Sequence, residues 1–321
     1  MRIYFCRQGL TYVCRILQQE LPEDDILDCP PDAVPEAAQQ ADVLIPTVSP
    51  IGSAALRSPR LKLVQQYGAG LDSVDIPAAT AAGVYVANVP TAGTGNAESV
   101  AELALFFMLG LARKYRQTQE SIQNRVLGSP MGQALKGKTV AIIGYGGIGR
   151  ALAQRLADFE MHILAVSRRG PTPDKPDNGI PLTHVAQDGF HAVLRAADFV
   201  ITAPPLNDET RGLMGQAEFA CMKPEAFVIN VARGPVLDYA ALLTALREGR
   251  IAGAGLDVFW SEPFDPNDEI FQYNVLATPH IGGATDVSLQ GIAKRVAENV
   301  NRLRRGEMPL NCVNAEVKPK G

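Results

Sequence analysis

The sequence has few cysteines, no long apolar run and no excess of basic residues, and each shortage excludes a class of protein. Its five cysteines are odd in number and scattered over 321 residues, so they fit neither a disulfide framework nor a C-x-x-C metal site, and no metal is expected. The longest apolar run, Leu103 to Ala112, is too short to cross a bilayer. The N-terminus has no apolar segment typical of a signal peptide. We therefore expect reduced thiols, a cytoplasmic location and no membrane partner.

The charge balance argues against nucleic acid as a partner. Lysine and arginine number 30 against 34 aspartates and glutamates, which gives a net charge of −4, and no basic tract occurs. The hydrophobic fraction of 46% is typical of a globular protein, and the length leaves room for two domains.

The most informative stretch is T-V-A-I-I-G-Y-G-G-I-G. Thr139–Ile143 predicts a buried parallel strand, and Gly144, Gly146 and Gly149 follow it in G-x-G-x-x-G order. Residues 150–157 then have helical spacing. Strand, glycine turn and helix in this order indicate a dinucleotide site, with the pyrophosphate at the helix N-terminus. The alternative is a glycine-rich strand-to-helix turn that binds nothing.

Short apolar segments alternate with helical stretches along the rest of the chain, which predicts parallel sheets covered by helices. We expect two long helices, Asn96 to about Asn124 and Thr285 to Arg305, to cross between domains, and Pro171 to Leu182 to form a proline-rich loop. The other expected strands are Arg2–Phe5, Ile26–Asp28, Val43–Ile45, Leu61–Gln66, Val84–Ala87, Met161–Val166, Phe199–Ala203, Phe227–Val231, Ala254–Val258 and Val275–Thr278.

The end of the second strand after the glycine motif indicates which dinucleotide binds. An acidic residue is expected there for NAD, but this chain has Ser167-Arg168-Arg169. A pair of guanidinium groups suits a 2′-phosphate, so NADP(H) is favoured and NAD(H) is the second choice. The alternative is two solvated arginines at a strand end.

Three ionisable residues follow separate predicted strands: Arg233, Glu262 and His280. Strand ends at one sheet edge converge on a ligand crevice, so these residues can meet. Arg233 suits a carboxylate and a keto oxygen, His280 suits proton donation, and Glu262 suits orientation of the imidazole. Taken singly, they also fit a structural ion pair, a surface carboxylate and a core histidine.

The turn Gly68-Ala69-Gly70 also follows a predicted strand. Successive backbone N–H groups in such a turn hold anions in many proteins. A plain turn explains the segment equally well.

Four segments in order, G-Y-G-G-I-G, N-V-A-R-G-P-V-L-D, L-D-V-F-W-S-E-P and T-P-H-I-G-G, resemble the D-isomer-specific 2-hydroxyacid dehydrogenase family. The similarity extends to Q-Y-G-A-G-L-D-S-V-D and N-A-E-S-V-A-E, and covers residues 60 to 305. It implies an α/β fold with two Rossmann-like domains, in which a cofactor domain (96–284) is inserted into a discontinuous, flavodoxin-like substrate domain (1–95 and 285–321). It also implies a homodimer.

The same resemblance implies roles for particular residues. The catalytic set would be Arg233, Glu262 and His280, and the substrate would bind Gly68, Ala69 and Gly70 together with Arg233 and His280. The expected cofactor contacts are Gly144, Gly146, Gly147, Ile148, Gly149, Ser167, Arg168, Arg169, Pro204, Val231, Ala232, Arg233, Asp257, His280, Gly282 and Gly283.

Departures from the family pattern narrow the activity. Ser167-Arg168-Arg169 resembles NADPH-preferring glyoxylate and hydroxypyruvate reductases. Gln66-Tyr67 stands where phosphoglycerate-binding relatives carry an arginine, and Glu262 stands where formate dehydrogenases carry glutamine. We therefore expect an enzyme that reduces small 2-keto acids to D-2-hydroxy acids. The alternatives are an NAD-linked oxidase of phosphite or of a phosphorylated hydroxy acid, and a nucleotide-sensing corepressor.

Overall fold

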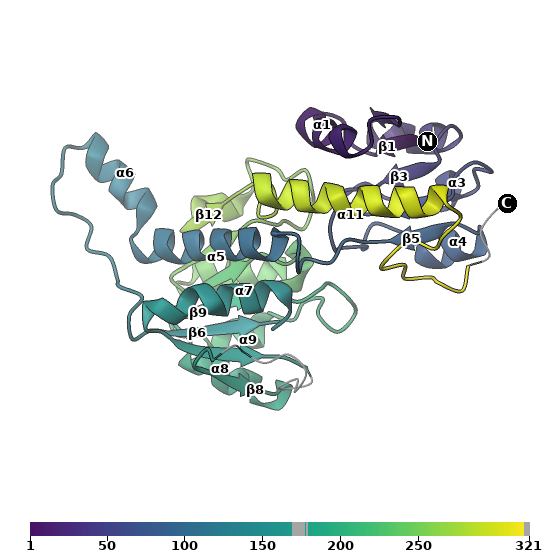
Figure 1. Cartoon of the computed structure of the whole chain (residues 1–321). Coiled ribbons are helices and arrows are strands. Elements are labelled where there is room, and N and C mark those ends of the chain that lie inside the picture. The colour runs from purple at the N-terminus through teal and green to yellow at the C-terminus, as the bar shows by residue number, and fades with distance from the viewer. Residues whose placement is uncertain (169–176, 178, 318–321) are drawn as a thin grey trace. The chain divides into compact units, whose positions relative to one another are not determined.

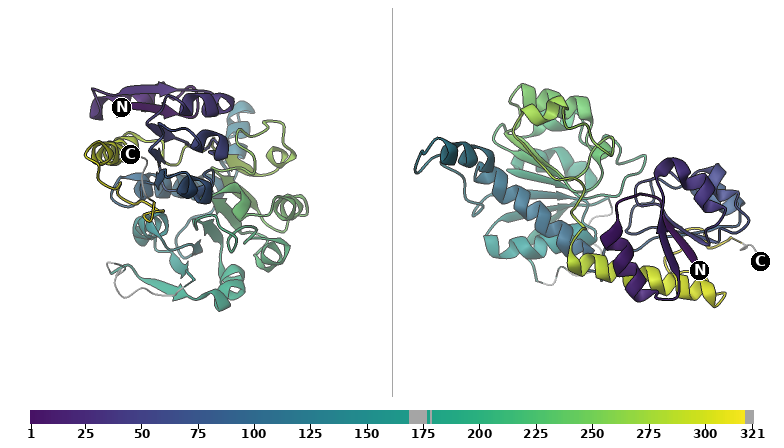
Figure 2. Two further views of the ribbon diagram at one scale, coloured as in Figure 1. Left: turned by 90° about the vertical axis from the view of Figure 1, so that its right-hand side faces the viewer. Right: turned by 90° about the horizontal axis from the view of Figure 1, so that it is seen from above.

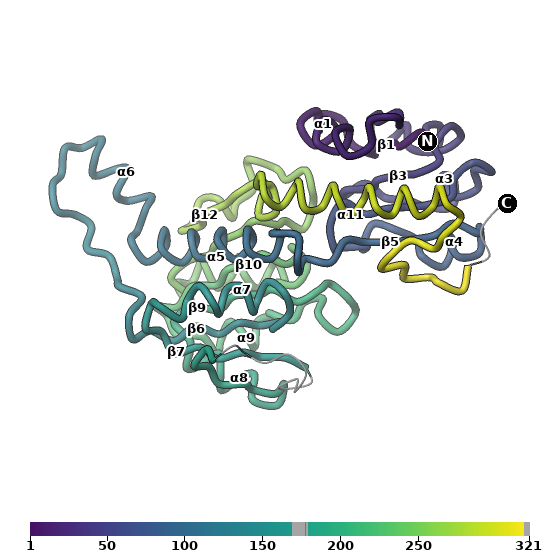
Figure 3. The backbone as a smooth tube through the Cα atoms, in the orientation of Figure 1, coloured from purple at the N-terminus to yellow at the C-terminus, as the bar shows by residue number. Residues whose placement is uncertain are grey.

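The chain folds into two compact α/β units, seen here in a computed structural model that describes residues 1–168, 177 and 179–317 (Figure 1). Unit 1 comprises Met1–Asn96 and Ala284–Gly321, and unit 2 comprises Ala97–Gly283. The chain leaves unit 1 once, builds unit 2 and returns (Figure 3). Each unit has its own parallel sheet, so the predicted fold class is confirmed.

Unit 1 is built on a five-stranded sheet in the order β2-β1-β3-β4-β5. One face packs against α1 and α11, which lie side by side (Figure 2), and the other packs against α2, α3 and α4. The strands are β1 (Arg2–Phe5), β2 (Asp25–Asp28), β3 (Val43–Ile45), β4 (Leu63–Gln65) and β5 (Tyr85–Ala87), and the helices are α1 (Thr11–Glu20), α2 (Val34–Ala38), α3 (Ser53–Leu56), α4 (Ile76–Ala81) and α11 (Asp286–Arg304).

Unit 2 is built on a seven-stranded sheet in the order β12-β11-β10-β9-β6-β7-β8. The strand order reverses between β6 and β9, where open α/β sheets bind their ligands. The strands are β6 (Thr139–Ile143), β7 (His162–Val166), β8 (Leu182–Val185), β9 (Phe199–Thr202), β10 (Phe227–Asn230), β11 (Gly253–Leu256) and β12 (Val275–Ala277), and the helices are α5 (Asn96–Ala112), α6 (Tyr115–Gln123), α7 (Gly147–Leu156), α8 (Phe190–Ala196), α9 (Gln216–Cys221) and α10 (Tyr239–Arg247).

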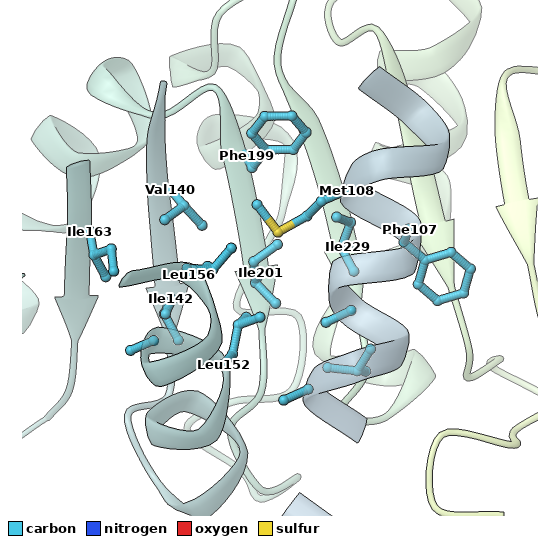
Figure 4. Packing of buried hydrophobic residues seen from close by; sticks show 14 of the residues in the cluster. Phe107, Met108, Val140, Ile142, Leu152, Leu156, Ile163, Phe199, Ile201 and Ile229 are labelled. Carbon is cyan, nitrogen blue, oxygen red and sulfur yellow. The ribbon is translucent and has the colours of Figure 1, made fainter. Parts of the chain in front are cut away.

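The core of unit 2 explains why its central strands read as continuous apolar runs. Every residue of β9, β10 and β11 is buried, because helices cover both faces of the sheet. On one face, α5 and α7 pack over β6 and β9, with Phe107 and Leu152 among the buried side chains (Figure 4). A separate cluster on the other face includes residues of α8, α9 and α10.

Two predictions of secondary structure are wrong. The expected helix from Asn96 to about Asn124 ends at Ala112, because Lys114 adopts a left-handed conformation (φ 53°) where the apolar sequence gives way to a polar one. The following helix, α6, buries none of its residues and projects away from the sheet of unit 2 (Figure 1). The segment expected as a loop up to Leu182 runs into β8, a short edge strand without a buried residue, whose L-T-H-V sequence has no continuous apolar run. Among the described residues, no helix is long and apolar enough to span a membrane.

Candidate active site

The candidate catalytic residues lie in loops that follow three neighbouring strands of unit 2. Arg233 comes after β10, Glu262 after β11 and His280 after β12, and these strands are adjacent in the sheet. All three strands are parallel, so their loops leave the same edge. The fold therefore brings together residues that are far apart in the sequence.

His280 and Glu262 form a hydrogen-bonded pair. Glu262 Oε2 lies 2.7 Å from His280 Nδ1, and Glu262 Oε1 accepts a hydrogen bond from the N–H of Phe259 at 3.1 Å. Burial alone would raise the pKa of Glu262, but the His280 hydrogen bond and charge outweigh it and hold that pKa below its ordinary value. A charged carboxylate on Nδ1 orients the imidazole and leaves Nε2 as the atom that can exchange a proton with a ligand.

Asp257, at the end of β11, fixes the loop that carries His280. Its side chain is 3% exposed and accepts hydrogen bonds from the Thr278 hydroxyl at 2.6 Å and from the N–H groups of Ile281 and Gly282, both at 2.8 Å. Burial raises the pKa of Asp257 although these three donors oppose the shift. His280 lies between the bonded residues with a left-handed backbone (φ 57°), so Asp257 stabilises an unusual local conformation.

Asn230 and Gly234 position the loop that carries Arg233. The buried Asn230 side chain donates to the carbonyl of Arg233 at 2.8 Å and accepts from the N–H of Ala232 at 3.0 Å. At Gly234, an added Cβ would lie 2.1 Å from the carbonyl of Phe259, so only glycine lets the two loops approach. The charge of Arg233 contributes to the lowered pKa of Glu262.

The glycine turn has the form that a dinucleotide needs. Gly144 has φ 97°, and a Cβ there would lie 2.6 Å from the nitrogen of Pro204, at the end of β9. A Cβ at Gly149 would lie 2.5 Å from the carbonyl oxygen of Gly144, so this glycine permits close packing of α7 on the turn. Gly146 instead faces space with no protein atom within 4 Å of its Cβ position. This open space lies at the N-terminus of α7, which begins with Gly147 and Ile148, and helix N-termini favour anions such as a pyrophosphate.

Arg168 pairs with a carboxylate from another loop. It follows β7 and lies 2.7 Å from Glu209, which is in the loop after β9. The two side chains are 58% and 64% exposed. The N–H of Ser167 donates to the carbonyl of Val185 at 3.4 Å, which extends the pairing of β7 with β8 by one residue. Arg169 lies outside the described residues.

The turn Gly68-Ala69-Gly70 belongs to unit 1, where the buried side chain of Gln66 organises it. Gln66 donates to the carbonyls of Gly70 at 2.7 Å and Thr47 at 2.9 Å, and accepts from the N–H of Tyr67. The remaining predicted cofactor residues belong to unit 2: Val231, Ala232 and Gly282 are buried, and Gly283 ends the unit.

Sequence reasoning overlooked the residues that support the site. Asn230 and Thr278 each carry a polar group at or next to the end of an apolar strand, and that pattern is the only signal that marks them in the sequence. Glu209 carries no such signal, because its contact with Arg168 depends on tertiary structure. Within the part of the chain that the structure describes, no three His, Cys, Asp or Glu side chains are placed to hold a metal ion.

A glycine turn at a reversal of strand order, together with a hydrogen-bonded His–Glu pair beside an arginine, is the arrangement of a dinucleotide-dependent oxidoreductase. The sequence profile of the "D-isomer specific 2-hydroxyacid dehydrogenase, NAD binding domain" matches residues 105–282. The glyoxylate reductase of Thermococcus litoralis is 36% identical over 98% of this chain and 97% of its own length. The chain belongs to the D-isomer-specific 2-hydroxyacid dehydrogenase family.

Solved structures agree with this assignment. The TT0316 protein from Thermus thermophilus superimposes with a TM-score of 0.83 at 30% identity, covering 98% of this chain and 100% of the other. A glyoxylate reductase from Paecilomyes thermophila gives 0.80 at 25% identity, with 99% of both chains covered. The protein is therefore an enzyme that uses a nicotinamide cofactor for hydride transfer on a 2-keto or 2-hydroxy acid.

Proposed function

We propose that this enzyme uses NADP(H) to reduce small 2-keto acids, such as glyoxylate and hydroxypyruvate, to D-2-hydroxy acids. The observation that carries the proposal is the 2.7 Å contact between His280 and Glu262, beside the loop of Arg233. The relatives named glyoxylate reductase support the substrate class. Arg168 at the end of β7 supports the choice of cofactor.

The chemistry follows from the three side chains. The nicotinamide, when bound, supplies the hydride for the carbonyl carbon. The planar fork of Arg233 holds the keto acid and polarises its carbonyl oxygen. His280, charged and held by Glu262, gives its Nε2 proton to the oxygen as negative charge develops there, and takes it back in the oxidation direction.

Arg168 is suited to a 2′-phosphate because its present partner is easily replaced. An ion pair between side chains as exposed as Arg168 and Glu209 contributes about 0–1 kcal/mol. A phosphate offers the guanidinium a doubly charged, bidentate partner instead. We propose that Ser167, Arg168 and Arg169 together select NADPH over NADH.

We further propose that unit 1 is the substrate domain and that the Gly68-Ala69-Gly70 turn binds the substrate carboxylate through backbone N–H groups. Unit 2 is then the cofactor domain. The φ of 147° at Gly68 and the bonds from Gln66 define the shape of the turn. A cytoplasmic location remains a prediction from cysteine usage.

A homodimer is supported by the surface of α5, α6 and the segment that follows. α6 buries nothing of its own, and large apolar side chains are exposed along this stretch. They are Phe106, Leu109, Tyr115, Ile122, Val126, Leu127 and Met131. We expect light scattering after size exclusion to give twice the mass of the chain, and a monomer at micromolar concentration would contradict this part of the proposal.

The experiment that tests the function is a panel of initial rates. Glyoxylate, hydroxypyruvate, pyruvate and phenylpyruvate are each assayed with NADPH and with NADH. We expect turnover of the small keto acids and a higher kcat/KM with NADPH. Turnover only of phosphite or of a phosphorylated hydroxy acid with NAD, or cofactor-dependent capture of a protein partner without any turnover, would replace the proposal with one of its alternatives.

A further inference from the structure

Two cysteines lie side by side in unit 1, away from the residues assigned to catalysis. Cys6 follows β1 and Cys29 follows β2, and the parallel register of these strands pairs Phe5 with Asp28. The ladder continues one residue further, because the N–H of Cys29 donates to the carbonyl of Phe5 at 3.0 Å. Cys6 and Cys29 are therefore a registered pair, whose side chains leave the same face of the sheet.

The spacing of this pair suits a covalent bond between the two sulfur atoms. Neighbouring strands lie about 4.8 Å apart, within the range of about 4.4–6.8 Å between Cα atoms that disulfides bridge. Both side chains belong to the same apolar cluster under α2, with Cys6 fully buried and Cys29 6% exposed. The Cys6 thiol donates to the carbonyl of Tyr4 at 3.9 Å, a contact between non-covalent partners that the thiol can give up.

The two thiols are not equivalent. The neighbouring Cys6 thiol lowers the pKa of Cys29, although burial and the charges of Asp28 and Asp32 oppose the shift. The Cys29 thiol, together with burial, raises the pKa of Cys6. Cys29 is thus the more acidic of the two and keeps a small exposed surface, so we take it as the attacking thiol and the fully buried Cys6 as the resolving one.

We propose that Cys6 and Cys29 form a reversible disulfide when the protein meets a peroxide. The Cys29 thiolate attacks one peroxide oxygen, the O–O bond breaks, and the leaving hydroxide takes a proton to become water. The sulfur of Cys6 then attacks the resulting sulfenic acid at Cys29, the S–O bond breaks, and a second water leaves with the Cys6 proton. Two thiols and one hydrogen peroxide thus give one disulfide and two waters.

The pair is joined to the predicted substrate turn by hydrogen bonds within unit 1. The N–H of Cys6 donates to the carbonyl of Ile45 at 2.9 Å, and the Cys6 carbonyl accepts from the hydroxyl of Ser49, so Cys6 contacts both the end of β3 and the loop after it. The carbonyl of Thr47 in that loop accepts from Gln66, which also holds Gly70. A disulfide that shifts Cys6 therefore changes the turn. This consequence, unlike the disulfide itself, rests on the proposed role of that turn.

The test uses the full-length reduced protein. It is treated with hydrogen peroxide, its remaining thiols are alkylated, and it is digested without reductant for mass spectrometry. We expect a peptide pair linked through Cys6 and Cys29, which disappears when dithiothreitol is added. Cys29→Ser should abolish the link, whereas Cys14→Ser should leave it intact. Cys14 is a matched control because it lies in the same unit and burial raises its pKa to about 11.

Activity supplies a second readout. Oxidised wild type should show a several-fold higher KM for the keto acid with little change in kcat, and Cys29→Ser should not respond to peroxide. Recovery of Cys6 and Cys29 as alkylated thiols after treatment, or as sulfonic acids without a link, would overturn the proposed disulfide. A link without a change in KM would overturn only its effect on the turn. The linked peptide is sought in the wild-type protein itself, so the test remains valid even if a variant folds poorly.

Discussion

Glu262 combines two tasks in one carboxylate. Oε2 contacts the imidazole of His280, and Oε1 accepts from the backbone of Phe259, so the side chain has little freedom to move. The lowered pKa of Glu262 means that it is charged throughout the neutral range. Because Glu262 contacts His280, we expect it to act as a positioning residue in the proposed reaction.

Replacement of Glu262 by glutamine should separate charge from geometry. An amide preserves the shape but stabilises the imidazolium less, so we expect kcat for keto-acid reduction to fall about 10²-fold, with KM nearly unchanged. In wild type the rate should fall as the pH drops through the lowered pKa of Glu262, and this fall should be absent in the variant. A profile identical to that of wild type would show that the carboxylate does not act through the histidine.

The same variant tests linkage between pH and stability. Because the pKa of Glu262 is lower in the folded protein, the stability that it contributes is complete above the ordinary glutamate pKa. It is lost as the pH falls through the lowered pKa. Denaturant unfolding from neutral to acid pH should therefore show a smaller loss of stability in Glu262→Gln than in wild type.

The sequence was sufficient to place Arg233, Glu262 and His280 after strands of one sheet, because strand ends are visible as apolar runs followed by turn residues. It was not sufficient to reveal Asp257 as the residue that fixes the histidine loop. Its hydrogen bonds to Thr278, Ile281 and Gly282 depend on how β11 and β12 lie side by side. Partners of this kind follow from tertiary structure rather than from local pattern.

Among the elements, the turn from β6 into α7 offers a matched pair of glycines. Alanine at Gly149 would place a Cβ 2.5 Å from the carbonyl oxygen of Gly144, so we expect a loss of about 1–3 kcal/mol in the free energy of unfolding. Alanine at Gly146 would meet no protein atom within 4 Å. Stability should then be unchanged while the Kd for NADPH, measured by fluorescence, rises. If Gly146→Ala bound NADPH with the wild-type Kd, the proposal that the pyrophosphate lies at this turn would be wrong.

We expect the loops after β7 and β9 to set the proposed preference for NADPH. Arg168→Ala should lower kcat/KM with NADPH about 10-fold to 100-fold, since a charged hydrogen bond contributes about 1.5–3 kcal/mol, and should leave NADH kinetics unchanged. Glu209→Gln, which removes the competing carboxylate, should raise kcat/KM with NADPH. Equal effects on both cofactors would mean that Arg168 does not recognise the 2′-phosphate.

The end of α5 and the edge strand β8 could not be predicted from sequence patterns. The apolar character of α5 was evident, but its end at Ala112 was not, because a left-handed residue such as Lys114 leaves no mark in composition. β8 was overlooked because an edge strand has no buried face that demands apolar side chains. The central strands were found because both of their faces are buried.

At the scale of the whole molecule, the chain completes one parallel sheet with β1–β5 and then builds a second with β6–β12. The alternation of strand and helix made the fold class predictable, and the single departure from unit 1 makes unit 2 an insertion. Family membership adds the reaction type, which the fold alone does not determine. The choice of substrate depends on loops whose side chains follow no periodic pattern.

The central claim is that His280 moves the proton for a reaction in which NADPH supplies the hydride. The most direct measurement compares glyoxylate turnover and NADPH affinity in wild type and His280→Ala. We predict a fall in kcat of about 10²–10⁴-fold with a much smaller change in the Kd for NADPH. Turnover by His280→Ala at the wild-type rate would contradict the account.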